Sequence, residues 1–139
     1  MADGHEKLEA QVLTPEGEVF SGELTQLSTK TTVGEVGILA RHIPMIARLV
    51  PAELRLHKSE SEVETYAQGE GWLEVFANRA RVLIAEAIPP DRLDAGDLRQ
   101  RLEDAETRLR EAEDGSAAAE QAERDRARAE AFIQIAESG

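Results

Sequence analysis

The sequence predicts an all-β N-terminal sandwich followed by an α-helical hairpin of two antiparallel helices, and three observations lead to this fold class. Residues 8–87 contain short runs of alternating apolar and polar side chains, separated by glycine, proline and asparagine. Such runs are typical of antiparallel strands. From Asp91 onward the apolar residues recur at helical spacing. Pro89 and Pro90 mark the change, so we expect a sandwich domain over residues 1–90 and a helical hairpin over residues 91–139.

The first strands of the sandwich are expected to be joined by tight turns. Residues 8–13 predict a strand, and residues 14–17 (T-P-E-G) predict a turn, because Pro15 supplies the fixed φ that the second turn position favours. A further strand begins at Val19, and we expect a bend at Ser21 and Gly22. The alternation of Leu24, Leu27 and their polar neighbours predicts that the chain continues as strand.

Residues 31–51, T-T-V-G-E-V-G-I-L-A-R-H-I-P-M-I-A-R-L-V-P, are the most constrained stretch. Gly34 and Gly37 flank Glu35, so we expect positive φ on both sides of a short turn that presents Glu35 outward. Val36, Ile38 and Leu39 predict a buried strand. Pro44 favours an extended crossover after His42 and Ile43. Met45, Ile46, Leu49 and Val50 are then expected to return to the core.

The remaining strands of the sandwich follow in short order. Residues 54–57 and 63–67 alternate, and the charged residues 58–62 between them predict an exposed hairpin tip. Gly69 and Gly71 predict a tight turn before the strand over residues 72–76, and Asn78 predicts another turn. The unbroken apolar run in residues 81–85 predicts a last strand that is buried on both faces.

The helical region predicts two helices of different composition. The first carries one apolar stripe, and either Asp91 or Asp94 can cap its start. Gly115 is expected to end it, and Ser116 to cap the second helix over residues 117–136. The second stripe is mostly alanine, which buries little apolar area, so we expect a weakly held hairpin. The two predicted stripes are Leu98, Leu102, Ala105, Leu109 and Ala112, and Ala118, Ala122, Ala129, Ile133 and Ala136.

Composition excludes several classes of function. The net charge is −12 at pH 7. Residues 1–90 and residues 91–139 each hold 14 acidic and 8 basic residues, so neither part is a basic nucleic-acid-binding module. There is no cysteine, which excludes disulfides and thiolate metal sites. No apolar run is long enough to span a bilayer, so we expect a cytoplasmic protein whose partners are proteins.

Motifs of catalysis are missing from the sequence. There is no G-x-S-x-G, H-E-x-x-H or G-x-x-x-x-G-K-[ST] sequence, and the glycine pair at 34 and 37 lacks the lysine and helix that a phosphate loop needs. His5, His42 and His57 stand without a second ligand at metal-binding spacing. We therefore expect no enzyme activity, no metal and no cofactor.

A family resemblance gives these features a function. The stretch G-E-V-G-I-L-A-R-H-I-P-M-I, with T-P-E-G upstream, resembles the signature of the epsilon subunit of bacterial F-type ATP synthases, and its wording is similar to that of actinobacterial members. The resemblance implies a non-catalytic rotor subunit of a proton-translocating ATP synthase, peripheral on the cytoplasmic face of the cell membrane. It implies that the sandwich joins the gamma subunit to the c ring, with contacts at Glu35 and His42.

The same resemblance implies a regulatory hairpin. In the family, the extended helices reach along gamma toward the beta and alpha subunits and inhibit ATP hydrolysis. Arg124, Arg126 and Arg128 are our candidates for the inhibitory contacts, by charge complementarity; as a group they could equally form a solvated face paired with Glu120, Glu123 and Glu130.

Some family members bind ATP on the hairpin through an Ile/Leu-Asp-x-x-Arg-Ala motif. Here Leu93 and Asp94 match, but Asp97 replaces the arginine and Leu98 the alanine. Arg128 also fits a family arginine, with Phe132 four residues later. Because the Asp97 carboxylate would repel phosphate, we expect weak or absent nucleotide binding.

Two alternative functions stay open: a free-standing β-sandwich adaptor with a helical protein-binding tail, and a small-molecule sensor that binds nucleotide in the hairpin.

Overall fold

The computed structural model describes residues 6–138, and the chain divides into two compact units. The first unit ends at Ile88 and the second begins at Pro89. The strands and helices are β1 (Leu8–Thr14), β2 (Gly17–Leu24), β3 (Gln26–Thr31), β4 (Gly34–Leu39), β5 (Met45–Leu49), β6 (Ala52–His57), β7 (Val63–Gln68), β8 (Gly71–Phe76), β9 (Arg79–Ile84), β10 (Ala87–Ile88), the 3-10 helix η1 (Pro90–Arg92), α1 (Ala95–Glu111) and α2 (Ala117–Ser138).

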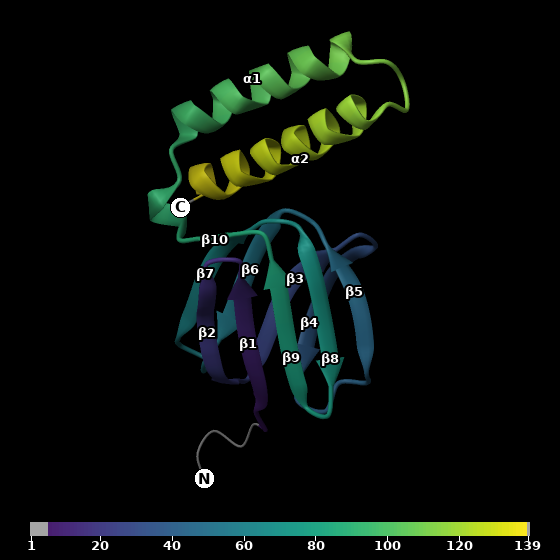
Figure 1. The fold of residues 1–139 in the computed structure, drawn as a ribbon. Helices are drawn as coiled ribbons and strands as arrows, with labels where there is room; N and C mark the ends of the chain where they lie inside the picture. Colours follow the sequence, from purple (N-terminus) through teal and green to yellow (C-terminus); the bar gives the residue numbers. More distant parts are fainter. Residues whose placement is uncertain (1–5, 139) are drawn as a thin grey trace. The chain divides into compact units, whose positions relative to one another are not determined.

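The first unit is a ten-stranded sheet that folds over into two layers (Figure 1). Its order is β10-β7-β6-β3-β5-β8-β9-β1-β2, with β4 attached to β3. Strands β3 and β5 share a single residue pair, Thr31 with Leu49, which is where the sheet passes from one layer to the other. The pair β1–β9 is parallel, and the other described pairs are antiparallel. The predicted sandwich is therefore confirmed.

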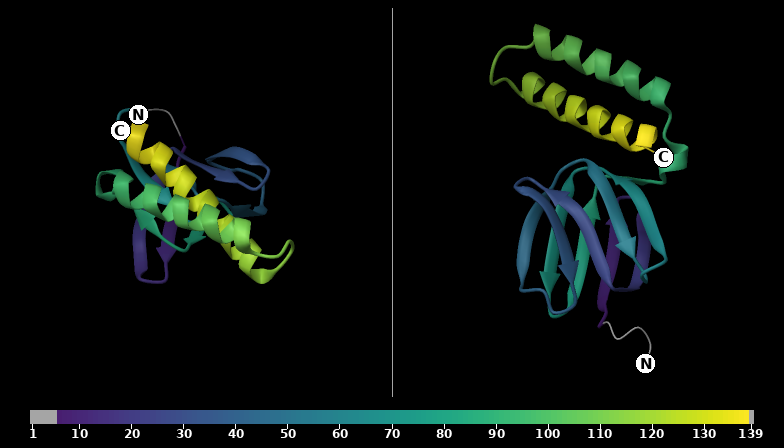
Figure 2. Two further views of the ribbon diagram at one scale, coloured as in Figure 1. Left: turned by 90° about the horizontal axis from the view of Figure 1, so that it is seen from above. Right: turned by 180° about the vertical axis from the view of Figure 1, so that it is seen from behind.

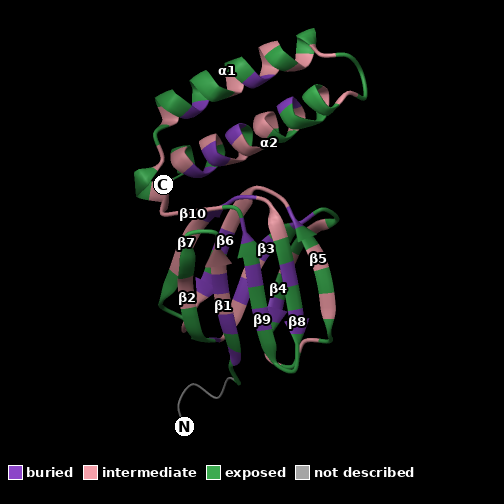
Figure 3. Cartoon of the chain, in the orientation of Figure 1, coloured by how far each residue is buried: buried purple, intermediate pink, exposed green. Residues whose placement is uncertain are grey.

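The core of the sandwich consists mainly of aliphatic residues on the inner faces of the strands, and more and less buried positions alternate along β1, β8 and β9 (Figure 3). Period-two alternation puts one face of each strand inside. Buried polar groups are also satisfied: Gln68 is fully buried, where its side chain accepts a hydrogen bond from Thr29 Oγ1 at 2.6 Å and donates one to the Val50 carbonyl at 2.9 Å. The fully buried branched residues include Val12, Leu24, Leu27, Ile38, Leu54, Leu56, Leu73 and Val82.

The glycine-rich stretch differs from the sequence expectation. Gly34 and Gly37 both lie within β4, so Glu35 is part of a strand that pairs with Lys30 of β3. The turn lies earlier, at Thr32 and Val33, and only Gly34 of the two glycines has positive φ, at 130°. The prediction of a turn at Glu35 was wrong because glycine also occurs within strands, often where another group approaches the backbone closely; an added Cβ at Gly37 would lie 2.8 Å from Gln26 Nε2.

Three further expectations about the strands were wrong. Leu39 and Ile46 are 56% and 70% exposed, and Leu83 is 41% exposed in a strand that alternates exposed and buried residues. These strands carry apolar side chains on their outer face as well, so the sequence predicted more burial than the structure shows. Strand β2 continues through Ser21 and Gly22, and the irregularity in the β1–β2 ladder lies between Val12 and Leu13 of β1, opposite Val19 of β2.

The second unit contains η1 and two antiparallel helices, which lie side by side in Figure 1 and in the right view of Figure 2. Asp94 caps α1 by accepting a hydrogen bond from the Asp97 amide at 3.1 Å. Ser116 caps α2 in the same way through the Ala119 amide, also at 3.1 Å. Gly115 has φ of 75° between the helices. The two predicted N-terminal caps are confirmed, whereas Gly115 does not end α1, which stops at Glu111 with an extended C-cap at Ala112.

The apolar stripe of the second helix was predicted only in part. Ala122 and Ala129 are buried as expected, but Ala118 is exposed, and Phe132 and Ile135 provide the large buried side chains. Of the predicted stripe of α1, Leu98 and Ala105 are buried and the others are half-buried. In α2, a run of alanines fits several helical faces equally well, so the few bulky residues decide which face is buried.

Candidate docking surface and helical hairpin

The loop between β4 and β5 holds His42 at one end of the sandwich. Its backbone is fixed by Asn78 of the β8–β9 turn, whose Oδ1 accepts from the Arg41 amide at 2.8 Å. The same side chain donates to the Lys7 carbonyl at 3.0 Å. Arg41 has φ of 65°, a left-handed conformation that costs a residue with a side chain about 1 kcal/mol or more. The hydrogen bonds to Asn78 offset this cost, so the loop has one defined shape.

His42 itself is half-buried within this loop. Its Nδ1 lies 2.8 Å from the Ile43 carbonyl, so Nδ1 carries the proton and Nε2 remains the free ring nitrogen. Beside it, Ile43 is 73% exposed. The side chain of Arg41 adds an ion pair from Nε to Glu6 Oε2 at 2.8 Å. The loop thus presents the apolar side chain of Ile43 and the imidazole of His42 beside the Arg41–Glu6 ion pair.

Glu35 lies far from His42 in this structure. Glu35 is the second residue of β4, and His42 follows three residues after the strand ends at Leu39. A strand rises about 3.3 Å per residue, so the two side chains lie toward opposite ends of β4. The exposed Glu35 faces Lys30 across the β3–β4 ladder, an opposite-charge pair of the kind that stabilises a strand pair. The two predicted contact residues therefore do not form a single small site.

An exposed apolar patch on β5 and β8 was not predicted from the sequence. Ile46, Trp72 and Phe76 are 70%, 47% and 68% exposed. In the β5–β8 ladder Ile46 faces Glu74 directly, which places it diagonally to both aromatic residues and within their reach. The guanidinium of Arg48 lies 5.4 Å from the centre of the Trp72 ring. We name these four residues, Ile46, Arg48, Trp72 and Phe76, the apolar patch.

The sequence did contain a signal for the patch. In residues 72–76, Glu74 alternates with Leu73 and Val75, so the face that carries the charge must be the outer one. Trp72 and Phe76 share that face. The role of Asn78 in fixing the His42 loop had no such signal, because a turn asparagine looks the same whether its side chain is free or joins distant segments.

A shallow depression of about 530 Å³ lies on the outer face of β8, β9, β1 and β2. It is lined by paired charges: Arg79 Nε lies 3.3 Å from Glu9 Oε2, and Arg81 Nη1 lies 3.8 Å from Glu74 Oε1. Each cation in it is balanced by a carboxylate, so the depression offers no concentrated charge to a small ionic ligand.

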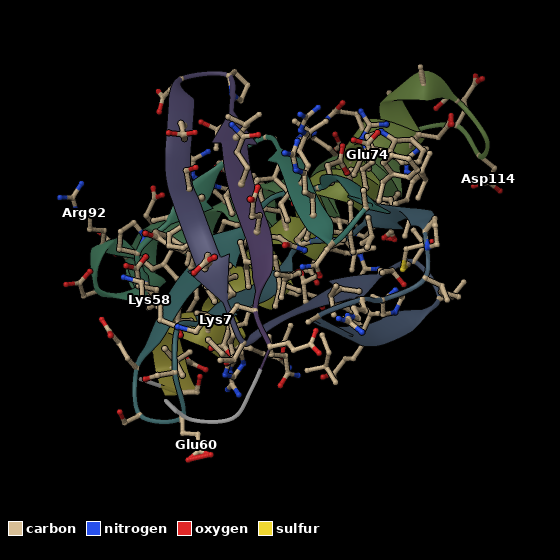
Figure 4. All side chains as sticks on the ribbon, turned by 90° about the horizontal axis from the view of Figure 1, so that it is seen from below. Lys7, Lys58, Glu60, Glu74, Arg92 and Asp114 are labelled. Carbon is tan, nitrogen blue, oxygen red and sulfur yellow. The ribbon has the colours of Figure 1, made fainter. Side chains whose placement is uncertain are left out.

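The charged side chains of the β6–β7 hairpin interact with one another. In the β6–β7 connection, where Figure 4 shows Lys58 and Glu60, Lys58 Nζ lies 2.5 Å from Glu64 Oε1, and Tyr66 donates to the other oxygen at 3.0 Å. The hydrogen bond from Lys58 holds the pKa of Glu64 below its ordinary value, and burial raises the pKa of Tyr66. This cluster stabilises the hairpin tip and leaves no carboxylate poised for acid–base chemistry.

The arginines of α2 are less free than the sequence suggested. Arg124 is exposed and donates to Gln121 Oε1 at 2.6 Å. Arg126 is half-buried and binds Glu123 and Glu130 of the same helix. Arg128 is half-buried with its guanidinium 4.6 Å from the centre of the Phe132 ring. The pairing with Glu123 and Glu130 follows the solvated-face alternative, while Arg128 also packs on an aromatic ring.

The stretch that corresponds to the nucleotide motif is occupied by its own interactions. Asp94 caps α1, and Asp97 Oδ2 accepts a hydrogen bond from Arg101 Nε at 2.9 Å. Leu98 is buried. Two carboxylates in one helical turn disfavour a bound polyphosphate by repulsion. Within residues 6–138 there is no group of three His, Asp or Glu side chains that could hold a metal ion; His5 lies outside the described residues.

Comparison with known proteins gives this fold a family. The family described as "ATP synthase, Delta/Epsilon chain, beta-sandwich domain" matches residues 7–90. The chain is 36% identical over 127 residues to the ATP synthase epsilon chain of Persephonella marina, covering 91% of this chain and 93% of that one. It is 32% identical over 125 residues to that of Sulfurihydrogenibium sp., covering 90% and 93%. The chain belongs to the ATP synthase epsilon chain family.

The predicted non-catalytic subunit of an ATP synthase is confirmed by these relatives, which are named as epsilon chains. A solved relative agrees in fold: a chain of the Euglena gracilis mitochondrial ATP synthase, in a structure titled OSCP/F1/c-ring, superposes with a TM-score of 0.80 at 20% identity, covering 100% of this chain and 87% of that one. At this identity the likeness shows the fold alone. No helix in residues 6–138 combines the length and apolar character that a membrane crossing requires.

Proposed function

We propose that the sandwich of this epsilon chain docks on the gamma subunit through the apolar patch and joins gamma to the c ring. The observation that carries the proposal is the patch itself. Contiguous exposed apolar residues on a folded protein mark an interaction surface, and aromatic residues with arginine are the groups that dominate binding energy at such surfaces. Structural neighbours come from complexes titled F1/c-ring and central stalk/cring, which supports partners of this kind.

The docking proposal has a direct test with a matched control. Trp72→Glu places a charge in the patch, whereas Val63→Glu places one at an apolar residue of β7 that is 42% exposed. Both variants keep the core intact. We expect Trp72→Glu to weaken binding to gamma at least about tenfold and Val63→Glu to leave it unchanged. Equal binding by both variants, measured by calorimetry, would contradict a dock at this face.

We propose Glu35 and His42 as contacts with the c ring. Because they lie toward opposite ends of β4, a contact that includes both must extend along that strand. Glu35→Gln removes the charge, and His42→Gln keeps a hydrogen-bonding side chain without the imidazole. Loss of coupling between ATP hydrolysis and proton pumping in either variant, with gamma binding retained, is the expected result. Normal coupling in both would remove these residues from the interface.

We propose that the helical hairpin, residues 91–139, regulates ATP hydrolysis by reaching the beta and alpha subunits when it opens. Arg124, Arg126 and Arg128 are the proposed contacts. For Arg126 this requires exchange of Glu123 and Glu130 for carboxylates of the partner. Exchanging one set of carboxylates for another adds little net affinity, but it fixes how the hairpin is positioned on its partner.

We propose in addition that ATP does not bind the hairpin, because the Asp94 and Asp97 carboxylates at the start of α1 would repel its phosphates. Micromolar affinity in a titration would contradict this.

As part of the complex, the protein would act at the cytoplasmic face of the cell membrane without crossing it. The similarity of residues 31–44 to actinobacterial members remains a prediction; a tree of epsilon sequences that includes this chain would test it.

The proposed function as a whole is tested by ATP hydrolysis of the alpha-beta-gamma complex with the full chain and with a chain ending at Pro90. We expect both to bind and only the full chain to inhibit. If neither binds, the adaptor alternative takes the place of this proposal.

A further inference from the structure

Two ion pairs join the helices of the hairpin. The Arg99 guanidinium of α1 binds the Glu137 carboxylate of α2, and Arg108 Nη2 of α1 lies 2.8 Å from Asp125 Oδ2 of α2. Gln121 donates to the other Asp125 oxygen at 2.9 Å, which orients the carboxylate. The first pair lies near the start of α1 and the end of α2, and the second lies farther along both helices. Together they connect the helices at two separated points.

Three further ion pairs described in the hairpin connect residues of one helix. Arg101 binds Asp97 four residues earlier in α1, and Arg126 binds Glu123 and Glu130 within α2. Pairs at this spacing stabilise a helix but do not hold it against a neighbour. Arg99 and Arg108 therefore have a different mechanical role from these arginines, although all are of the same residue type on the same hairpin.

The helices bury little apolar area against each other, so the ion pairs contribute a larger share of the attraction between them. Ala105, Ala122 and Ala129 are half of the buried apolar residues in the hairpin, and alanine contributes little buried area. Residues 91–139 also carry a net charge of −6, with 14 acidic and 8 basic residues. A weakly packed element with excess negative charge repels itself, so attractive pairs between its helices count for more than they would on a large core.

We propose that Arg99–Glu137 and Arg108–Asp125 form an ionic latch that keeps the hairpin closed and that rising ionic strength releases it. The four side chains are 39–58% exposed, so salt screens their attraction: the screening length falls from about 30 Å at 0.01 M to about 3 Å at 1 M salt. The regulatory consequence, that salt favours the inhibitory state, rests on the proposed function. The latch itself is a property of the free chain.

The latch can be measured directly as a distance between the helices. The chain contains no cysteine, so nitroxide labels can be attached to Gln100→Cys in α1 and Gln134→Cys in α2, both at exposed positions. Double electron–electron resonance spectroscopy then gives the distribution of distances between the two labels in the full chain at about 0.01 M and about 1 M NaCl. We expect one short distance at low salt and an added population of long distances at high salt.

Variants separate the latch from general effects of salt. The variant Arg99→Gln/Glu137→Gln/Arg108→Gln/Asp125→Asn keeps the net charge and removes both pairs. We expect its ratio of open to closed hairpin at low salt to be about three- to tenfold higher than that of the natural chain, and this ratio should not rise with salt, because salt then screens mainly the repulsion between the acidic helices. The control Arg79→Gln/Glu9→Gln removes an exposed ion pair of the sandwich, also without changing the net charge, and is expected to leave the ratio unchanged.

Reversal provides the decisive variant. The variant Arg99→Glu/Glu137→Arg exchanges the charges of the first pair and leaves the Arg108–Asp125 pair in place. Attraction between the helices is kept, so we expect this variant to be closed at low salt and to open as salt rises, as the natural chain does. If the variant without both pairs stays as closed as the natural chain at low salt, or responds equally to salt, the latch is contradicted. If the distances respond as expected but inhibition of the alpha-beta-gamma complex does not follow them, the latch stands and the regulatory function fails.

Discussion

The buried positions of the β-sandwich carry mainly leucine, isoleucine and valine, whereas half of those in the helical hairpin carry alanine. The sandwich closes its core with side chains from both layers, and the buried Gln68 side chain both accepts a hydrogen bond, from Thr29, and donates one, to the Val50 carbonyl. The hairpin relies on Phe132, a few aliphatic residues, two helix caps and exposed ion pairs. Because alanine buries little apolar area, we expect the hairpin to open at a lower free-energy cost than the sandwich.

The largest expected effect comes from a glycine of the sandwich. An alanine Cβ at Gly71 would lie 1.9 Å from the Leu83 carbonyl oxygen, where β8 and β9 approach closely. Since backbone must move, we expect Gly71→Ala to lower the free energy of unfolding by about 4 kcal/mol, as measured by urea denaturation. Gly37→Ala is the control, because it meets only the flexible end of Gln26. Similar losses for both would show that the β8–β9 contact is not tight.

The next effect is confined to the hairpin. Phe132 is fully buried in α2, and its removal is expected to cost the hairpin about 3 kcal/mol. Hydrogen exchange of Phe132→Ala should show faster exchange throughout α1 and α2 and unchanged protection in the sandwich. Phe76→Ala, which truncates a 68% exposed ring, should change neither. If Phe132→Ala also loosens the sandwich core, the two units do not open independently.

A smaller effect should strengthen the hairpin. Gly96 lies in the first turn of α1, and a Cβ there would have only Asp94 Oδ1 as a neighbour, at 3.4 Å. Replacing glycine by alanine in a helix gains about 1 kcal/mol. We expect Gly96→Ala to raise the helical circular dichroism and slow exchange in α1, and to weaken inhibition of ATP hydrolysis because the closed form is favoured. Unchanged exchange would mean that the Asp94 cap already limits this turn.

The smallest effect is a pH dependence of the sandwich. The hydrogen bond from Lys58 lowers the pKa of Glu64 in the folded chain. A lowered folded pKa adds stability above the unfolded value of 4.5, and this stability is lost as the pH falls through the folded pKa. Glu64→Gln should therefore lose less stability than the natural chain between about pH 5 and pH 3. Glu23→Gln serves as the control, and identical slopes for all three chains would contradict the assignment.

Much of the fold could be predicted because local rules and tertiary structure agree. The alternation along β6 and β8, the turn at residues 14–17, and the caps Asp94 and Ser116 all depend on residues close together in the sequence. Such signals depend on neighbours in sequence, which a single chain displays. The change from period two to helical spacing at Pro89 and Pro90 is of the same kind.

Features that depend on distant segments could not be predicted. Whether Gly37 lies in a turn or a strand is decided by β3, with which β4 pairs. Whether Ile46 is buried is decided by the register with β8. The separation of Glu35 and His42 follows from the extended course of β4, which a motif read as one short stretch does not reveal.

Native-state hydrogen exchange of the full chain at increasing urea concentration tests the central claim, that the hairpin opens independently of the sandwich. The account predicts that amides of residues 95–138 exchange through openings at least about a hundredfold more frequent than those of β1, β8 and β9, a difference of about 2.7 kcal/mol. Their opening should also depend less on urea, because less surface is exposed. If both units share one opening free energy and one urea dependence, the chain unfolds as a single body and the account is contradicted.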